Sequence, residues 1–363
     1  MSCFITRTGA YLPGSPIEND QIDRFLGTLD GESEVKRQVL AMNGIERRHY
    51  AQDSLQRPTE SVYQMAAHAV EACLRDDPST TPVTFLAAGS TYAPFSGPGF
   101  ASLLHHQTAS HLRLNHPIEI SSHGGICTSS AAALVAACRA VECGSHETAL
   151  CVGAEHSSEV LKSTAMKPID DRALHSELRN SQWFMSVFLR FMLSDGAGAF
   201  LVDRHPNPTG LSLSVDWTHS QSMAHETPIC MKLDNSSHLL SQDVKVLNRY
   251  LFPMAEKFVR SAFERYQESL NSYRVVLPHL SSFFFRRKME RMMEQLSCDG
   301  RKSIPYWTNL GTAGNTGAAS IYIMLDQFLR EQSLQHGERI LLFIPESGQF
   351  NFVLVSLNEI VKQ

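Results

Sequence analysis

Cys127 is the residue of this chain best placed to act as a nucleophile. It follows two glycines and precedes Thr128 and an alanine-rich stretch that predicts a helix. At a helix N-terminus, backbone N–H groups and the helix dipole favour a thiolate, so we expect its pKa to be lowered. The glycines before it let the backbone approach a ligand closely. The alternative is a small buried side chain that only fills space.

An imidazole and a carboxamide in the second half of the chain have settings that suit the same chemistry. His279 follows the apolar run 275–278, which predicts a buried strand ending in a proline. Asn315 lies at the start of a predicted helix, where capping that helix is the alternative role. A thiolate can take up an acyl group, while two neutral donors hold the enolate oxygen of a second thioester. The three residue types together indicate carbon–carbon bond formation between thioesters.

These side chains need elements that bring them together, and the chain alternates predicted strands with predicted helices. Such alternation is typical of an α/β fold in which helices cover both faces of a sheet. The predicted strands cover 83–90, 148–155, 198–202, 273–280, 339–348 and 350–357, and the predicted helices cover 128–144 and 316–337.

The two halves of the chain repeat one unit. In each half a glycine-containing turn opens a helix of small residues, and the next strand ends in a glutamate. The separation between Cys127 and Glu155 is nearly the same as that between Asn315 and Glu346. Two such units are expected to pack about a pseudo-dyad with matching loops at the centre. A fortuitous repeat of common α/β order is the alternative.

The length of 363 residues allows two such halves with a sizeable core. The boundary is expected in the polar stretch 204–209. This gives an N-terminal half over 1–205, which carries the nucleophile, and a C-terminal half over 206–363, which carries His279 and Asn315.

Composition excludes several classes of protein. With 43% hydrophobic and 19% charged residues, the chain is neither disordered nor a coiled coil. A net charge of −5 argues against nucleic-acid binding. No apolar stretch is long enough to predict a membrane span, and no secretory signal is recognised, so a cytoplasmic protein is expected. The eight cysteines form no CxxC pair, which predicts reduced thiols and no metal site.

Longer segments carry a resemblance to a known family. The segments HGGICTSSAAALVAACRAVECGSHETALCVGAE, LSDGAGAFLV, VVLPHLSSFFFRRKM and NLGTAGNTGAASIYIMLDQFL resemble the ketoacyl synthase III-like condensing enzymes of the thiolase superfamily. The opening TGAYLPGSPIEND and NGIERRHYA resemble the N-terminal signature of that family. The resemblance implies a thiolase-like five-layered αβαβα fold with two pseudo-symmetric halves, and a homodimer.

The resemblance also implies roles for individual residues. Cys127 matches the nucleophile, and His279 and Asn315 match the pair that polarises the second thioester carbonyl. The backbone N–H of Gly348, in the turn IPESGQF, is expected to join that of Cys127 in an oxyanion hole. The acyl groups would be carried on coenzyme A or on the phosphopantetheine of an acyl carrier protein, with no other cofactor.

Two departures from the family pattern concern the carrier of the acyl group. Ser282 replaces an asparagine that contacts pantetheine in the family, and the tryptophan before the Gly-Ile-x-x-Arg motif is missing. A carrier protein is therefore favoured over coenzyme A. Arg286 and Arg287 belong to a basic cluster that is expected to receive an acidic carrier or a phosphate, unless it is only a solvated face.

Four short motifs, YLPGSPIEN, NGIERRHYA, HLSS and IPESG, are most similar to the ketosynthase/cyclase branch that makes dialkylresorcinol and stilbene precursors. In that branch a β-ketoacyl carbanion attacks the enzyme-bound acyl group, and the product closes to a 1,3-cyclohexanedione. The alternatives are a 3-oxoacyl-[acyl-carrier-protein] synthase III with a malonyl donor and a noncatalytic thiolase-like subunit. A cysteine protease or amidase fits less well, because such a site needs no internal repeat.

Glu155 is the fourth candidate catalytic residue. It ends the strand predicted over 148–155 and is expected to project toward Cys127. Ring closure needs a proton removed from a second carbon, and a carboxylate beside an apolar tunnel would have a raised pKa suited to that task. The alternative is a structural carboxylate that accepts backbone N–H bonds.

Overall fold

The computed structural model describes residues 2–29, 32–75, 79, 81–166, 185–234, 240–297 and 305–362 of the chain. Its main feature is a nine-stranded sheet with the order β11-β12-β13-β8-β1-β7-β6-β4-β5. The first half of the chain supplies five neighbouring strands of it, which are β1 (Cys3–Tyr11), β4 (Phe85–Ser90), β5 (Glu119–Gly124), β6 (Thr148–Glu155) and β7 (Gly196–Asp203).

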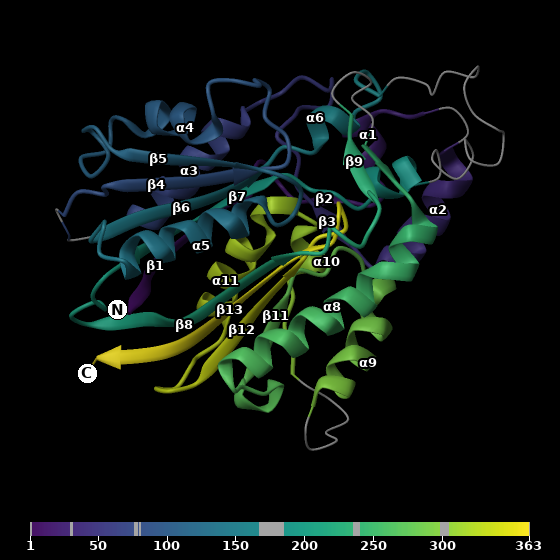
Figure 1. The fold of residues 1–363 in the computed structure, drawn as a ribbon. Helices are drawn as coiled ribbons and strands as arrows, with labels where there is room; N and C mark the ends of the chain where they lie inside the picture. The colour runs from purple at the N-terminus through teal and green to yellow at the C-terminus, as the bar shows by residue number, and fades with distance from the viewer. Residues whose placement is uncertain are drawn as a thin grey trace.

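The second half supplies the other four strands in a matching arrangement. They are β8 (Gly210–Ser222), β11 (Val275–Pro278), β12 (Arg339–Pro345) and β13 (Asn351–Lys362). β4 and β6 are parallel, as are β11 and β12, and the next strand in each half runs antiparallel to them. β1 and β8 pair over only a few residues, and beyond that contact the two halves diverge (Figure 1).

Helices lie between the diverging halves and outside them (Figure 1). α5 (Ser129–Glu142) and α11 (Ser320–Glu331) lie between the two groups of strands. α3 (Val62–Leu74) and α4 (Phe100–Thr108) cover the outer face of the first group. α8 (Val244–Tyr266) and α9 (Arg286–Leu296) lie outside the second. The five layers expected from the sequence are therefore present.

Small residues allow the central layer to form. β6 is buried along its whole length, as expected for a strand covered on both faces. A Cβ on Gly89 would lie 2.6 Å from the backbone of Ser129, and a Cβ on Gly153 would lie 2.8 Å from the carbonyl oxygen of Ala318. The two helix starts can approach the strands only because these positions have no side chain.

Three apolar clusters follow the layers. One joins α5 and α11 to the facing sides of the strands, one lies under α3 and α4, and one lies under α8 and α9. The remaining elements flank the site: β2 (Ile17–Glu18), β3 (Arg47–Arg48), β9 (Met231–Leu233), β10 (Leu240–Gln242), α1 (Ile22–Leu26), α2 (Glu32–Asn43), α6 (Ser158–Leu161), α10 (Leu310–Ala313), and the 3-10 turns η1 (Leu270–Ser272), η2 (Phe283–Phe285) and η3 (Gly317–Ala319).

Several boundaries differ from the sequence prediction. The strand predicted over 273–280 is only β11, because Pro278 ends its hydrogen-bonded ladder. The helix predicted over 316–337 begins as η3 and ends at Glu331. The predicted boundary between 205 and 206 falls between β7 and β8 and stays a prediction. Among the described residues, no helix is both long and apolar enough to span a bilayer.

Candidate active site

Cys127 lies on the turn between β5 and α5. The turn needs glycine at Gly125, whose φ of 156° is rare for other residues. α5 begins two residues after Cys127, so the thiol stands at the end of the helix where N–H groups are exposed. The residue is half-buried, and its side chain faces a cavity between the two halves of the protein.

Two apolar cavities meet at Cys127. The first has an empty volume of about 650 Å³ and the second about 550 Å³. Phe188, Leu189 and Met192 are among the apolar residues of the first, and Leu251, Phe252 and Met289 are among those of the second. Four residues line both cavities: Cys127, Ser281, Phe285 and Ser347.

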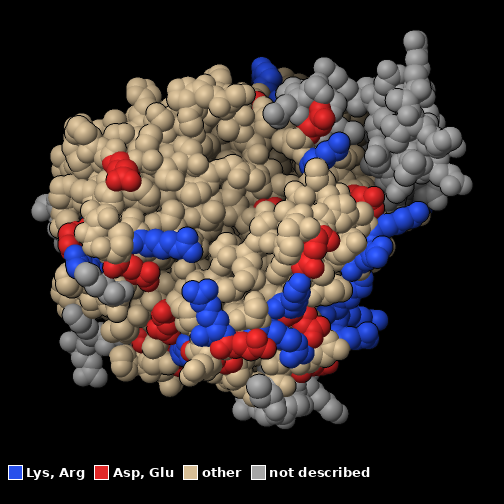
Figure 2. Space-filling view, in the orientation of Figure 1, with Lys and Arg blue, Asp and Glu red and all other residues tan. Residues whose placement is uncertain are grey.

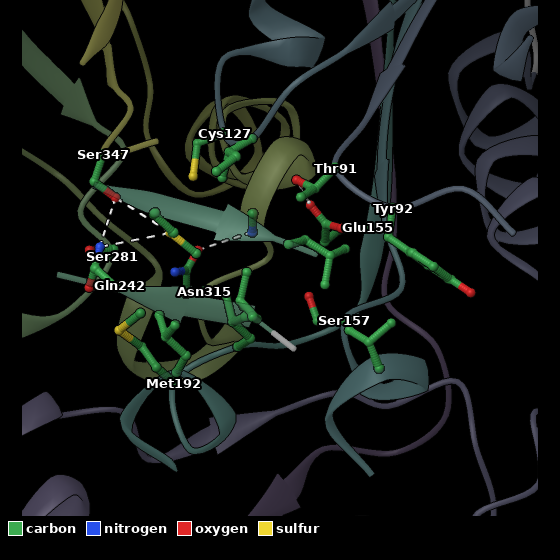
Figure 3. Close-up of a pocket in the computed structure, with 18 of the residues that line it drawn as sticks. Thr91, Tyr92, Cys127, Glu155, Ser157, Met192, Gln242, Ser281, Asn315 and Ser347 are labelled. Carbon is green, nitrogen blue, oxygen red and sulfur yellow. Dashed lines mark hydrogen bonds between the residues drawn. The ribbon is translucent and has the colours of Figure 1, made fainter. Parts of the chain in front are cut away.

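Asn315 lines the first cavity together with Cys127 (Figure 3). Its backbone N–H donates to the carbonyl of Met192 at 3.2 Å, and its own carbonyl accepts from the N–H of Ser194 at 2.8 Å. Its side-chain oxygen accepts from the N–H of Gly317 at 3.0 Å. With the backbone and this oxygen fixed, the carboxamide offers its Nδ2 group as a donor to the cavity.

His279 lines the second cavity at the carboxyl end of β11. It is buried, and its backbone N–H donates to the carbonyl of Phe343 at 2.8 Å. Its Nε2 has no hydrogen-bond partner among the described residues. Burial lowers the pKa of the imidazole to about 4, so the ring is neutral at ordinary pH. A neutral ring can donate one hydrogen bond to a substrate oxygen.

Gly348 lies beside the turn of the nucleophile. A Cβ at this position would lie 2.8 Å from the Cδ1 atom of Ile126, the residue before Cys127. The carbonyl of Gly348 accepts from the N–H groups of Cys230 and Met231 at 2.9 and 3.1 Å, which fixes the peptide. Gly348 thus packs against the side chain of the residue before Cys127, and the oxyanion hole formed by the Cys127 and Gly348 amides stays a prediction.

The prediction of an acidic thiol is wrong. The pKa of Cys127 is raised well above its ordinary value, first by burial and then by the charges of Glu346 and Glu155. The backbone N–H of Cys127 lowers the pKa of the thiol, but burial and two carboxylates outweigh it. The thiol is therefore protonated at rest, and a substrate must find it in that form.

Glu155 lines the first cavity, opposite Cys127 in Figure 3. Its Oε2 accepts from the hydroxyl of Thr91 at 2.5 Å and from the backbone N–H of Ala318 at 3.1 Å. Burial raises its pKa to about 7, and these two bonds oppose the rise. Glu155 is thus a structural carboxylate that accepts a backbone N–H, and it also has access to the cavity and a pKa suited to proton transfer.

None of the three residues assigned to carrier binding lines either of the two cavities. Ser282 is fully buried, lines neither cavity, and accepts from the N–H of Phe284. Its hydroxyl caps η2, and the polar group that this segment offers to the cavities is Ser281. Arg286 begins α9 and pairs with Glu290 at 2.9 Å. Arg287 follows it on the same exposed helix start.

Several residues of the site are missed by sequence reasoning. Gln242 comes from β10 and donates to the Ser347 hydroxyl at 3.0 Å, so a polar pair lies to one side of Cys127 and Asn315 in the first cavity (Figure 3). Thr91 follows β4. The positions of Ser281, two residues after His279, and of Ser347 beside Gly348 were signals that sequence reasoning did not use. Nothing in the sequence singles out Gln242.

The chain is similar to known proteins in part of its sequence and in its fold. Residues 264–345 match the sequence model of the 3-oxoacyl-[acyl-carrier-protein] synthase III C-terminal family. The structure is similar to 3-oxoacyl-[acyl-carrier-protein] synthase III from Aquifex aeolicus VF5, with a TM-score of 0.72, 20% identity and 99% and 100% of the two chains covered.

Two further solved structures have the same fold. One is AbyA1, a tetronic acid condensing enzyme, with a TM-score of 0.74, 17% identity and 98% and 99% coverage. The other is a cysteine-to-serine variant of OleA from Xanthomonas campestris with bound lauric acid and lauroyl-CoA, with a TM-score of 0.74, 17% identity and 99% of each chain covered. The chain therefore has the thiolase-like α/β fold of the 3-oxoacyl synthase III structures.

Proposed function

We propose that this protein is a condensing enzyme that joins two acyl thioesters by a Claisen reaction. The observation that carries the proposal is the meeting of two apolar cavities at one thiol. Asn315 stands in the first cavity and His279 in the second. A noncatalytic subunit would need neither the thiol at this junction nor the two neutral donors around it.

Loading begins when the thiol of Cys127 attacks an acyl thioester. Because the resting thiol is protonated, its proton must leave as the carbon–sulfur bond forms, and the carrier thiol departs with a proton. The amides of Cys127 and Gly348 are suited to stabilise the oxyanion of this step. The acyl chain then occupies one of the apolar cavities.

Condensation follows when the α-carbanion of a second thioester attacks the carbonyl of the acyl-enzyme. The neutral His279 and the Nδ2 group of Asn315 are the donors available to the enolate oxygen of that thioester. The new carbon–carbon bond forms as the bond to the Cys127 sulfur breaks, and the released sulfur takes up a proton in place of the one that the α-carbon gave up. The second apolar cavity favours a second substrate that itself carries a chain, such as a β-ketoacyl thioester, over a malonyl thioester.

Ring closure to a 1,3-cyclohexanedione, the precursor of a dialkylresorcinol, extends this proposal. The step needs a base for a second carbon of the condensed chain. Glu155 lines the cavity that holds Cys127 and Asn315, and its pKa of about 7 leaves much of it ionised at neutral pH. We assign the deprotonation to Glu155.

A carrier protein is the proposed source of the acyl groups, on the phosphopantetheine arm, and coenzyme A is the alternative carrier. Figure 2 shows Lys and Arg gathered over the side of the molecule where α8 and α9 lie. Arg286 and Arg287 belong to this surface, and residues of α8 and α9 line the second cavity beneath it. The surface complements an acidic carrier.

A homodimer is the proposed assembly. β5 is the terminal strand of the sheet, and its residues are exposed or only half-buried. Ile120 is an exposed apolar side chain on that strand. An unpaired edge of this kind is suited to pair with a second copy. Light scattering of the purified protein tests this assembly.

The proposed function is tested by the intact mass of the protein after incubation with acyl thioesters of increasing chain length. We expect a mass gain of one acyl group, lost in Cys127→Ala. Adding a β-ketoacyl thioester should then discharge the acyl-enzyme and yield a condensed product in the extract. A noncatalytic subunit would show no mass gain with any thioester. A malonyl-dependent synthase would be discharged by a malonyl thioester, with release of carbon dioxide.

A further inference from the structure

Each half of the protein ends a central strand in a glutamate that reaches into the other half. Glu155, at the end of β6, accepts the N–H of Ala318 beside Asn315 with its Oε2 atom at 3.1 Å. Glu346, directly after β12, accepts the N–H of Thr128 with its own Oε2 atom, also at 3.1 Å. The contacts are reciprocal, so each half holds the functional turn of the other.

Glu346 makes further bonds that fix its carboxylate. The hydroxyl of Thr128 also donates to Oε2, and Nδ2 of Asn351 donates to Oε1 at 3.0 Å. The backbone N–H of Glu346 donates to the carbonyl of Asn351 at 2.8 Å. The side chain is buried and lines neither cavity. It therefore meets Thr128 rather than a substrate.

The same carboxylate touches the other side of the oxyanion site. A Cβ at Gly348 would lie 2.8 Å from Oε1 of Glu346. Glu346 thus links the turn that carries Cys127 to its own segment, which carries Gly348 two residues later. A displacement of about 1 Å in such a site can reduce a rate about 100-fold, so the relative place of these two segments matters for acyl transfer.

We propose that Glu346 is the positioning residue of the nucleophile: through Thr128 it holds the turn of Cys127 against the segment of Gly348. This inference rests on the proposed function in taking Cys127 as the group that is acylated. The negative charge of Glu346 raises the pKa of the Cys127 thiol. Glu346 therefore contributes through the hydrogen bonds that it accepts and not by activating the sulfur.

Two variants separate the bonds from the charge. Glu346→Gln keeps an oxygen for Thr128 and removes the charge, while the amide of Asn351 can turn to accept from the new NH₂ group. Glu346→Ala removes both. The matched control is Glu359→Gln. Glu359 is also a buried carboxylate, but it lies near the end of β13, whereas Asn351, which contacts Glu346, begins that strand.

The first measurement is the rate of acylation of Cys127 by an acyl thioester, followed by intact mass. We expect Glu346→Gln and Glu359→Gln to remain within about threefold of the parent, and Glu346→Ala to fall roughly 10- to 100-fold. A wild-type rate in Glu346→Ala overturns the proposal, as does an equal loss in Glu346→Gln and Glu346→Ala. If Glu346→Ala does not fold, Thr128→Val takes its place, with an expected loss of about threefold to tenfold.

The second measurement needs no acyl substrate: the pH dependence of Cys127 alkylation by iodoacetamide, read by peptide mass. The titratable groups that face the thiol are Glu346, Glu155 and, across the second cavity, His279. Both Glu346 variants should shift the midpoint down by about one pH unit, and Glu359→Gln should not shift it. An unchanged midpoint in the Glu346 variants would show that the carboxylate does not lie against the thiol.

Amide hydrogen exchange of the peptide that contains Thr128 completes the test. We expect faster exchange in Glu346→Ala than in Glu346→Gln, because only the alanine variant loses the acceptor. Equal exchange in the two variants overturns the positioning role. If the parent protein is never acylated, the proposed function fails, while the alkylation and exchange results still decide the role of Glu346.

Discussion

Glu155 and Glu346 occupy corresponding places in the two halves of the molecule, but they face different surroundings. Both are buried, and both accept a backbone N–H from the opposite half at 3.1 Å. Only Glu155 lines a cavity, where its remaining surface meets Thr91 and the space beside Cys127. The comparison teaches that one structural position of the repeat accepts a hydrogen bond from the opposite half in both cases and, where the cavity reaches it, supplies the carboxylate that we propose as the base.

The largest expected effect comes from the donors that distinguish loading from condensation. In Asn315→Ala and His279→Ala we expect condensation to fall by about 10² to 10³ for each lost donor, while acyl loading on Cys127 persists. The loss arises because each donor holds the enolate of the second substrate only. Single-turnover loading by intact mass and product formation by chromatography measure the two steps. Equal loss of both steps would show that the donors serve the thiol or the fold.

The second effect compares the two glutamates directly. Glu155→Gln keeps an acceptor for Ala318 and loses the base, so we expect a linear product in place of the ring, with ring formation reduced by about 10². Glu346→Gln should leave the ratio of ring to linear product unchanged. Mass spectrometry of the extracted products, after derivatising the free carboxyl group, distinguishes them. Normal cyclisation in Glu155→Gln would show that Glu155 only accepts the N–H of Ala318 and does not act as the base.

Sequence reasoning predicted the central elements well because their pattern is local. The strand over 148–155 and the small-residue helix near 128–144 are present almost as expected, since continuous burial and glycine-marked turns leave few alternatives. Cys127, His279 and Asn315 were predicted from equally local signals, since Cys127 and Asn315 precede buried helical turns and His279 follows a buried strand; their catalytic roles stay predictions. The convergence of two cavities on the thiol depends on distant segments and had no local signal.

The pKa of Cys127 shows why the rest could not be predicted. Its place before a helix predicts an acidic thiol, but burial raises the pKa of the thiol, and the charge of Glu346, from a segment more than two hundred residues away in the sequence, raises it further. Ser282 also differs from the expectation of its motif, and its assignment to pantetheine binding stays a prediction. Its place in the motif predicts contact with pantetheine, whereas the start of η2 turns its hydroxyl back onto the N–H of Phe284. For Cys127 a tertiary contact decided what the local pattern left open, and for Ser282 a hydrogen bond within its own turn did.

The third effect is on stability, and it concerns the buried proton of Glu155. The folded-state pKa is about 7, above the ordinary value of 4.5, so between these values the folded protein keeps a proton that the unfolded chain releases. The stability contributed by Glu155 therefore falls as the pH rises from about 5 to 7 and levels off above. In Glu155→Gln this dependence disappears.

Urea unfolding of both proteins at pH 5 and pH 8 measures the difference. The free energy of unfolding of Glu155→Gln relative to the parent should rise between these pH values by up to about 3 kcal/mol. Other titrating groups are common to both proteins and cancel. A pH-independent difference would mean that Glu155 has an ordinary pKa in the folded protein, which would weaken its assignment as the base.

The smallest effect concerns Thr91, whose hydroxyl donates to Glu155 and lowers the pKa of that carboxyl against the effect of burial. Thr91→Val keeps the shape and removes this donor. A hydrogen bond to a charged group contributes about 1.5–3 kcal/mol, which corresponds to a rise of about one to two pH units in the midpoint of Glu155. Since the base acts when ionised, ring formation should need a higher pH in the variant and reach the same plateau. Acyl loading, which does not use Glu155, should keep its pH profile.

A lower plateau of ring formation at every pH, with an unmoved midpoint, would show that Thr91 shapes the cavity and does not change the pKa of Glu155. A midpoint that shifts for ring formation alone would show that the titrating group is Glu155, the glutamate that lines the first cavity.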